Sequence, residues 1–101
     1  MVDAGVMFVL FVTQKTKQFA SLVRTTLESF EQPFELFEFD ADVEAKIADF
    51  YEVIALPTLI REHADDRGRY QLIGECTAKE VLHFARNPQV VVCGRSEKRK
   101  S

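Results

Sequence analysis

An uninterrupted apolar run near the N-terminus constrains the fold of this 101-residue chain more than any other feature. Residues 6–12 read Val-Met-Phe-Val-Leu-Phe-Val. A strand with one face in water alternates apolar and polar side chains, whereas this run is apolar at every position. It therefore predicts a central strand that is covered on both faces, in a sheet with helices above and below it.

The same run does not read as a membrane or targeting segment. A membrane-spanning helix needs roughly 20 apolar residues. A signal peptide needs a basic flank and a small-x-small cleavage site, whereas here Asp3 precedes the run and no such site follows it. We therefore expect a cytoplasmic protein with no membrane partner.

Composition and charge predict one folded domain that does not bind nucleic acid. The chain is 47% hydrophobic and 29% charged, which is typical of a globular domain. Residues 1–94 carry nine basic and 15 acidic side chains, and residues 95–101 carry four basic and one acidic. We expect a single domain over 1–94 and a basic flexible tail over 95–101. Phosphate contacts need clustered Lys and Arg, which the acidic domain lacks.

The residues after the first strand predict a helix, a strand and a second helix. Apolar side chains recur at helical spacing from about Lys15 to Glu31, and Pro33 stops this helix. A Phe-rich strand follows over residues 34–39. Asp42 is the predicted N-cap of a short helix. The apolar positions of that helix are Val43, Ile47, Phe50, Tyr51 and Ile54.

The second half of the chain predicts a hairpin and a last helix. Strands over residues 58–60 and 70–73 flank a turn over residues 64–68, and a connection this short requires antiparallel pairing. Thr77-Ala78-Lys79-Glu80 is a capping box, which opens a helix that ends at Arg86. The sequence leaves open whether the following apolar residues pair on a sheet edge: Val90, Val91 and Val92.

The resulting element order is β-α-β-α-β-β-α. The first strand–helix–strand passage is long enough for a right-handed parallel crossover. The predicted fold class is therefore α/β, with a four-stranded mixed sheet and helices on both faces. This is the arrangement of thioredoxin-like folds.

Several segments carry a resemblance to the thioredoxin-like superfamily. Residues 54–60, Ile-Ala-Leu-Pro-Thr-Leu-Ile, resemble the start of the third strand in that superfamily, where a cis peptide bond precedes the proline. Gly74 followed by a capped helix is also similar, and the resemblance covers about residues 6–86. Ala55-Leu56-Pro57-Thr58-Leu59 is similar to the Ala-Thr-Pro-Thr-Leu stretch of the KaiB family, which includes the N-terminal sensor domain of the clock histidine kinase SasA. Thr13-Gln14-Lys15-Thr16 replaces the usual Gly-Asn-Thr-Pro turn of that family.

The resemblance implies a cis Leu56–Pro57 bond and a non-enzymatic interaction module. Its partner would be a protein, such as a KaiC-type ATPase or a histidine kinase, in a circadian clock or another signalling system. The groove between the first helix and the proline loop would bind this partner, with Lys15 and Lys17 adding positive charge. The candidate partner-binding residues are Gln14, Lys15, Thr16, Lys17, Leu56, Pro57 and Thr58.

Thioredoxin-type redox chemistry is excluded at its usual position. An attacking cysteine belongs where the first strand meets the first helix, because the helix N-terminus stabilises a thiolate there. Residues 13–18 contain no cysteine. We therefore expect no enzyme and no cofactor. We interpret Cys76 as a small buried apolar residue and Cys93 as an exposed thiol, both reduced in the cytoplasm.

Two alternatives stay open. The chain could be a thioredoxin-like or glutathione-transferase-like redox protein or sensor that uses Cys76, or an oligomerisation unit of a longer signalling protein. A metal site is not expected, because the histidines and cysteines lack the paired short spacings of zinc ligands. The nine phenylalanines fall mostly at positions that predict a core.

Overall fold

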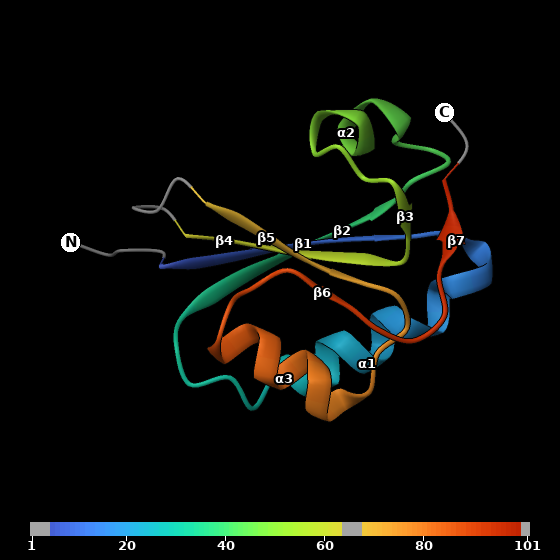
Figure 1. Cartoon of the computed structure of the whole chain (residues 1–101). Helices are drawn as coiled ribbons and strands as arrows, with labels where there is room; N and C mark the ends of the chain where they lie inside the picture. The colour runs from blue at the N-terminus through green and yellow to red at the C-terminus, as the bar shows by residue number, and fades with distance from the viewer. Residues whose placement is uncertain (1–4, 64–67, 100–101) are drawn as a thin grey trace.

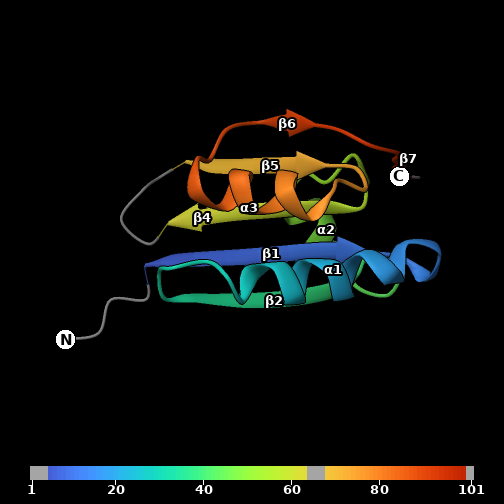
Figure 2. The ribbon, with the colours of Figure 1, turned by 90° about the horizontal axis from the view of Figure 1, so that it is seen from below.

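The apolar strand near the N-terminus lies at the centre of a mixed β-sheet in the computed structural model. This strand, β1 (Val6–Val12), pairs in parallel with β2 (Phe34–Asp40) and antiparallel with β4 (Thr58–His63). The sheet continues through β5 (Arg69–Ile73) to β6 (Val91–Val92), in the order β2-β1-β4-β5-β6 (Figure 2). The long parallel crossover thus connects the central strand β1 to the edge strand β2. The β4–β5 hairpin extends the sheet on the other side of β1.

Helices cover both faces of this sheet. A 3₁₀ turn, η1 (Gln14–Thr16), leads into α1 (Lys17–Leu27), which lies beside α3 (Ala78–Arg86) on one face. The short helix α2 (Ala45–Phe50) lies on the opposite face (Figure 1). The sheet therefore has a larger apolar core under α1 and α3 and a smaller one under α2.

Alternation along β1 divides its side chains between these two cores. Phe8 and Leu10 belong to the core under α1 and α3, whereas Val9 and Phe11 belong to the core under α2. All four are buried. The prediction of a central strand covered on both faces is confirmed.

Not every phenylalanine is in the core. Phe37 and Phe50 are 43% and 66% exposed, although the sequence pattern favoured burial. Phe37 lies on the edge strand β2, on the face that α2 covers, and α2 is only six residues long. The short helix reaches the ring of Phe39, which stacks on Phe11, and leaves Phe37 uncovered.

The sheet has one strand more than predicted. Val91 and Val92 pair in parallel with Leu72 and Ile73, so the apolar residues that follow α3 form an edge strand. A further ladder joins β3 (Ala55–Leu56) to β7 (Glu97–Lys98) in antiparallel register.

The expectation of a flexible tail over residues 95–101 does not hold for residues 95–99. Arg95 forms a bridge with Glu75, and β7 pairs with β3. Backbone groups of the tail thus find partners far back in the chain, which a charge pattern cannot reveal.

Two helix boundaries also differ from the predictions. The first helix ends at Leu27 rather than about Glu31, because its backbone continues as turns of i to i−3 hydrogen bonds up to Phe30. The N-cap of α2 is Glu44 rather than Asp42. Asp40 takes the capping role one turn earlier, since its Oδ1 accepts the backbone N–H of Asp42 at 2.8 Å.

The structure describes residues 5–63 and 68–99. Most of the predicted turn over residues 64–68 lies outside these ranges, whereas the two strands that flank it pair antiparallel as predicted. Within the described residues, no helix has the length and apolar character needed to cross a membrane.

Candidate functional site

The start of the first helix is held by a pair of threonines. The backbone N–H of Thr13 donates to Thr16 Oγ1 at 2.9 Å, and the N–H of Thr16 donates to the Thr13 carbonyl at 3.1 Å. Thr16 is buried, so it shapes this turn. Gln14, Lys15 and Lys17 are exposed and can meet a partner.

The proline loop lies between β3 and β4. The Leu56–Pro57 peptide bond is cis. Thr58 is fully buried, and its hydroxyl donates to the Ala55 carbonyl at 2.7 Å, which closes the loop from inside. Leu56 and Pro57 are buried as well. This loop therefore projects none of these three side chains into solvent.

Three of the seven candidate residues line one groove, and Pro57 and Thr58 lie beside Leu56 in the loop without lining it. Gln14, Lys15 and Leu56 line a groove of about 330 Å³, and a neighbouring hollow of about 180 Å³ includes Thr16. Lys17 instead lines a separate hollow beside Arg24. We call the seven candidate residues, which the sequence resemblance supplied, the loop surface.

The chain's own C-terminal residues share the groove with the loop surface. Glu97, Lys98 and Arg99 line it opposite Gln14 and Lys15. An exposed ion pair of 3.7 Å joins Lys15 Nζ to Glu97 Oε2. Sequence reasoning missed this contact, because we expected residues 95–101 to form a flexible tail.

Arg99 is the anchor of this C-terminal segment. Its guanidinium donates to the carbonyls of Val53 at 3.2 Å and Ala45 at 3.0 Å, and its Nη2 lies 2.7 Å from Asp49 Oδ1. The Arg99 side chain is only 12% exposed. A basic residue in a charged terminal run carries no signal for burial, so the sequence could not have identified it.

Cys76 and Cys93 form a disulfide, which corrects the expectation of two reduced thiols. Their Cα atoms are 5.6 Å apart. Cys76 is buried at the start of α3, as predicted, but Cys93 is half-buried rather than exposed. Pairing of β6 with β5 brings the two cysteines together. The sequence left open whether Val91 and Val92 form a strand, so it could not predict this disulfide.

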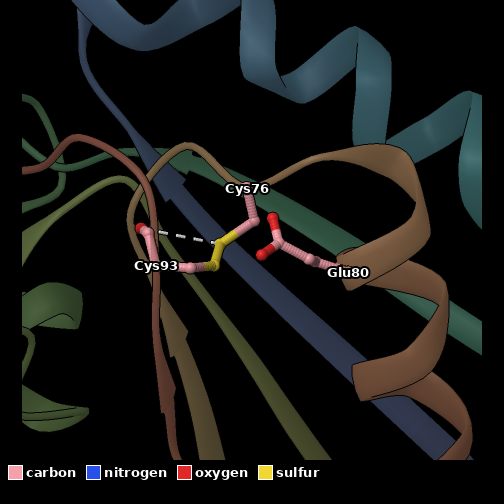
Figure 3. A group of neighbouring side chains, drawn as sticks. All are labelled: Cys76, Glu80 and Cys93. Atoms are coloured by element: carbon pink, nitrogen blue, oxygen red, sulfur yellow. Dashed lines mark hydrogen bonds between the residues drawn. A yellow bond between two sulfur atoms is a disulfide. The ribbon is translucent and has the colours of Figure 1, made fainter.

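Glu80 lies against this disulfide (Figure 3). One ligand atom from each of Cys76, Cys93 and Glu80 falls within 4.8 Å of the others. Metal ions bind thiolates, and sulfurs that are bonded to each other are not thiolates. The carboxylate is also engaged elsewhere, because Glu80 Oε1 accepts the backbone N–H of Thr77 at 2.8 Å in the capping box.

One carboxyl group and one phenol group away from the loop surface have shifted pKa values. A hydrogen bond from Arg86 lowers the pKa of Glu31 below its usual range. Desolvation raises the pKa of Tyr51, and the nearby negative charge of Glu62 adds to this effect. Neither group lies in the groove, so neither points to acid–base chemistry there.

Comparison with solved structures places this architecture among known folds. Chloroplastic thioredoxin z is 14% identical with a TM-score of 0.69, over 82% of this chain and 77% of that one. The germline-specific thioredoxin Deadhead of Drosophila melanogaster is 17% identical with a TM-score of 0.68, over 84% and 83%. The N-terminal domain of Synechococcus elongatus SasA is 16% identical with a TM-score of 0.64, over 82% and 81%.

No protein-family model and no curated protein sequence matches the chain. At identities this low, the structural likeness shows the fold alone. The central parallel pair, the antiparallel hairpin and the helices on both faces agree with these neighbours over more than four-fifths of the chain. The chain therefore has a thioredoxin-like fold.

Proposed function

We propose that this chain is a non-enzymatic protein–protein interaction module that binds its partner through the loop surface. The ladder between β3 and β7 carries the proposal. Ala55 and Leu56, directly before Pro57, already hold an extended segment in antiparallel register. Addition of an extended segment to an exposed strand edge is a common mode of peptide recognition, in which main-chain hydrogen bonds supply affinity.

The partner we propose is a KaiC-type ATPase or a histidine kinase in a clock or signalling pathway of the cytoplasm. The similarity to the KaiB family and the structural likeness to the SasA N-terminal domain support this choice. The exposed amines of Lys15 and Lys17 favour an acidic partner surface, because opposite charges increase the association rate and set the register.

Reversal of both lysines tests this proposal. Lys15→Glu/Lys17→Glu should weaken binding of a purified KaiC-type ATPase by about 1–3 kcal/mol at low salt, as expected for lost charged contacts. The free energy of unfolding should change little, since both side chains are exposed. Binding is measured by surface plasmon resonance at two salt concentrations.

A matched charge change elsewhere is the control. Lys46→Glu/Lys79→Glu alters the net charge equally on α2 and α3, and neither residue lines the groove. This control should bind like the wild type. Equal loss of binding in both double variants would mean that net charge, rather than the loop surface, governs the interaction.

A redox sensor is the second candidate function, and the Cys76–Cys93 disulfide favours it. In a reducing compartment, disulfides in proteins are usually transient and serve catalysis or redox sensing. An insulin-reduction assay separates the two classes. If the wild type reduced insulin and Cys76→Ser did not, the result would support redox catalysis. It would contradict a function in protein binding alone.

A further inference from the structure

The strand edge beside the proline loop is already occupied by the chain's own C-terminal segment, residues 94–99. In this segment Lys98 pairs with Ala55 and Glu97 with Leu56, and the backbone N–H of Arg99 donates to the Ile54 carbonyl at 2.9 Å. Figure 1 shows β7 running beside β3. A partner segment that adds to this edge must therefore displace residues of the chain itself.

The segment is bound by few groups, apart from the Arg99 anchor. Residues 94–98 are exposed along their whole length. Besides the β3 ladder, the N–H of Glu75 donates to the Arg95 carbonyl at 2.9 Å. A ladder this short with exposed side chains buries little apolar surface, and such segments open readily.

The disulfide adds a covalent tie at the start of the segment. It fastens Cys93 to Cys76, which precedes the capped N-terminus of α3. The N–H of Cys93 also donates to the Ile73 carbonyl at 2.9 Å, so the tie lies where β6 leaves the sheet. Holding residue 93 in place keeps residues 94–99 within reach of β3 and lowers the entropic cost of pairing.

The geometry also accommodates the reduced pair. The Cys76 sulfur faces the carbonyl of Cys93, as the dashed line in Figure 3 shows, and the two atoms are 3.7 Å apart. The Gly74 carbonyl oxygen lies 3.5 Å from the same sulfur. A disulfide sulfur has no hydrogen to donate, whereas a thiol at Cys76 would find two acceptors in place. The half-buried Cys93 is the more accessible sulfur for an attacking thiolate.

We propose that residues 94–99 are an internal ligand of the β3 edge, and that reduction of the Cys76–Cys93 disulfide releases them so that a partner can bind. This inference rests on the proposed function, because it concerns the same edge. The partner is an extended segment that carries an arginine, which would take the site that Val53, Ala45 and Asp49 now offer to Arg99.

The switch is a thiol–disulfide exchange with a dithiol reductant. One thiolate of the reductant attacks Cys93 Sγ and breaks the S–S bond, and Cys76 leaves as a thiolate that takes a proton. The second thiol of the reductant then displaces Cys93, which also takes a proton. Two electrons and two protons pass to the protein, and the reductant leaves as its cyclic disulfide.

Amide exchange in the full-length chain tests the release without any partner. By NMR, the Arg99 amide should exchange about tenfold faster or more after reduction with dithiothreitol. The Leu10 amide in the fully buried central strand reports global unfolding, so it should speed up only as far as the lower stability of the reduced protein requires. Arg99→Ala should show the open state of the edge, read at Glu97, without reduction, because Glu97 and Leu56 form the next hydrogen-bonded pair after Arg99 and Ile54. Equal Glu97 and Arg99 exchange in the oxidised and reduced wild type would overturn the proposal. Glu97 and Arg99 amides that exchange as slowly as Leu10 in the reduced protein would overturn it as well, because the segment would then open only by global unfolding.

A peptide with the sequence of residues 94–99 tests whether reduction makes the β3 edge available to another segment. The fluorescently labelled peptide should bind the reduced chain at least about tenfold more tightly than the oxidised chain. Alanine at the Arg99 position of the peptide should abolish this binding. Equal affinity for both redox states would overturn the proposal. These two experiments need no biological partner, so they test the redox switch separately from the proposed function. If the lysine-reversal experiment failed, the switch would still stand. If the exchange and peptide experiments failed, the loop surface would still stand as a proposed binding site.

Discussion

At the scale of single residues, two glycines allow the chain to cross itself beside the disulfide. Gly74 and Gly94 both have positive φ, at +109° and +65°. A Cβ on Gly74 would lie 1.7 Å from the Cys93 carbonyl oxygen, and one on Gly94 would lie 2.0 Å from that of Glu75. Only glycine permits this approach of two backbones, so the C-terminal crossing depends on both.

Gly94→Ala should therefore destabilise the oxidised protein. We expect the free energy of unfolding to fall by about 1–3 kcal/mol, because the methyl group meets backbone atoms and the positive φ is strained. Urea unfolding followed by circular dichroism measures the change. The control is Ser96→Ala on the same exposed segment, which should stay within about 0.5 kcal/mol of the wild type. A Gly94→Ala protein as stable as this control would show that the crossing can relax.

At the scale of secondary-structure elements, charged groups join the ends of the two helices on one face. Arg86, the last residue of α3, donates from Nη2 to Glu31 Oε1 at 2.6 Å and from Nε to the same oxygen at 2.9 Å. Arg61 of β4 is buried beneath α3, and its Nε donates to the Ala85 carbonyl at 2.8 Å. The C-terminal end of α3 is thus held both to the turn after α1 and to the sheet.

The Glu31–Arg86 pair predicts a pH dependence with a definite sign. Because Arg86 lowers the pKa of Glu31 in the folded state, the pair stabilises the protein above the ordinary pKa of Glu31. That contribution is lost as the pH falls through the lowered pKa. It is small, since Glu31 is exposed. In Arg86→Gln, an NMR titration should show the pKa of Glu31 raised toward its ordinary value.

The control for this titration is Arg24→Gln. Arg24 forms a similar exposed pair with Glu38, whose Oε2 lies 2.6 Å from Arg24 Nη1. Its removal changes the net charge equally, but it should leave the pKa of Glu31 where it is. If both variants raised the pKa alike, long-range charge rather than the direct pair would be responsible.

At the scale of the whole molecule, the C-terminal segment leaves the edge strand β6 and pairs with β3, directly before β4 begins. Its partners lie far back in the sequence, and Val53 and Arg99 are 46 positions apart. Arg99 packs on the α2 side, whereas the disulfide lies at the start of α3 on the other face. The segment therefore links the two layers that the sheet separates.

Removal of the disulfide should cost stability but not the fold. The bond closes a loop with a sequence separation of 17 residues, for which chain entropy predicts a loss of about 3 kcal/mol. Cys76→Ser/Cys93→Ser should lose this amount in urea unfolding relative to the oxidised wild type. The reduced wild type is the control and should match the double variant. A double variant as stable as the oxidised protein would contradict the prediction.

Much of the fold could be predicted because its signals are local. The continuous run of β1 specified a strand covered on both faces, and the Thr77–Glu80 capping box specified the start of α3, where Glu80 N–H donates to Thr77 Oγ1. For the candidate site, the resemblance located the loop surface, and the structure brings three of its seven residues together around one groove and places Thr16 in the neighbouring hollow. Burial of Thr16 and Thr58 was not predicted, since a threonine at the end of an element can point either way.

The sequence by itself determined the three helices and the strands β1, β2, β4 and β5, because hydrophobic spacing, capping residues and turns act over a few neighbours. Only the tertiary structure decided how the last residues of the chain are used. The two-residue strands β6 and β7 carry no periodicity, and their hydrogen-bond partners are set by the positions of β5 and β3. The Cys76–Cys93 bond and the Arg99 anchor follow from those pairings, since each joins groups that become neighbours only after the sheet and both helical layers are assembled.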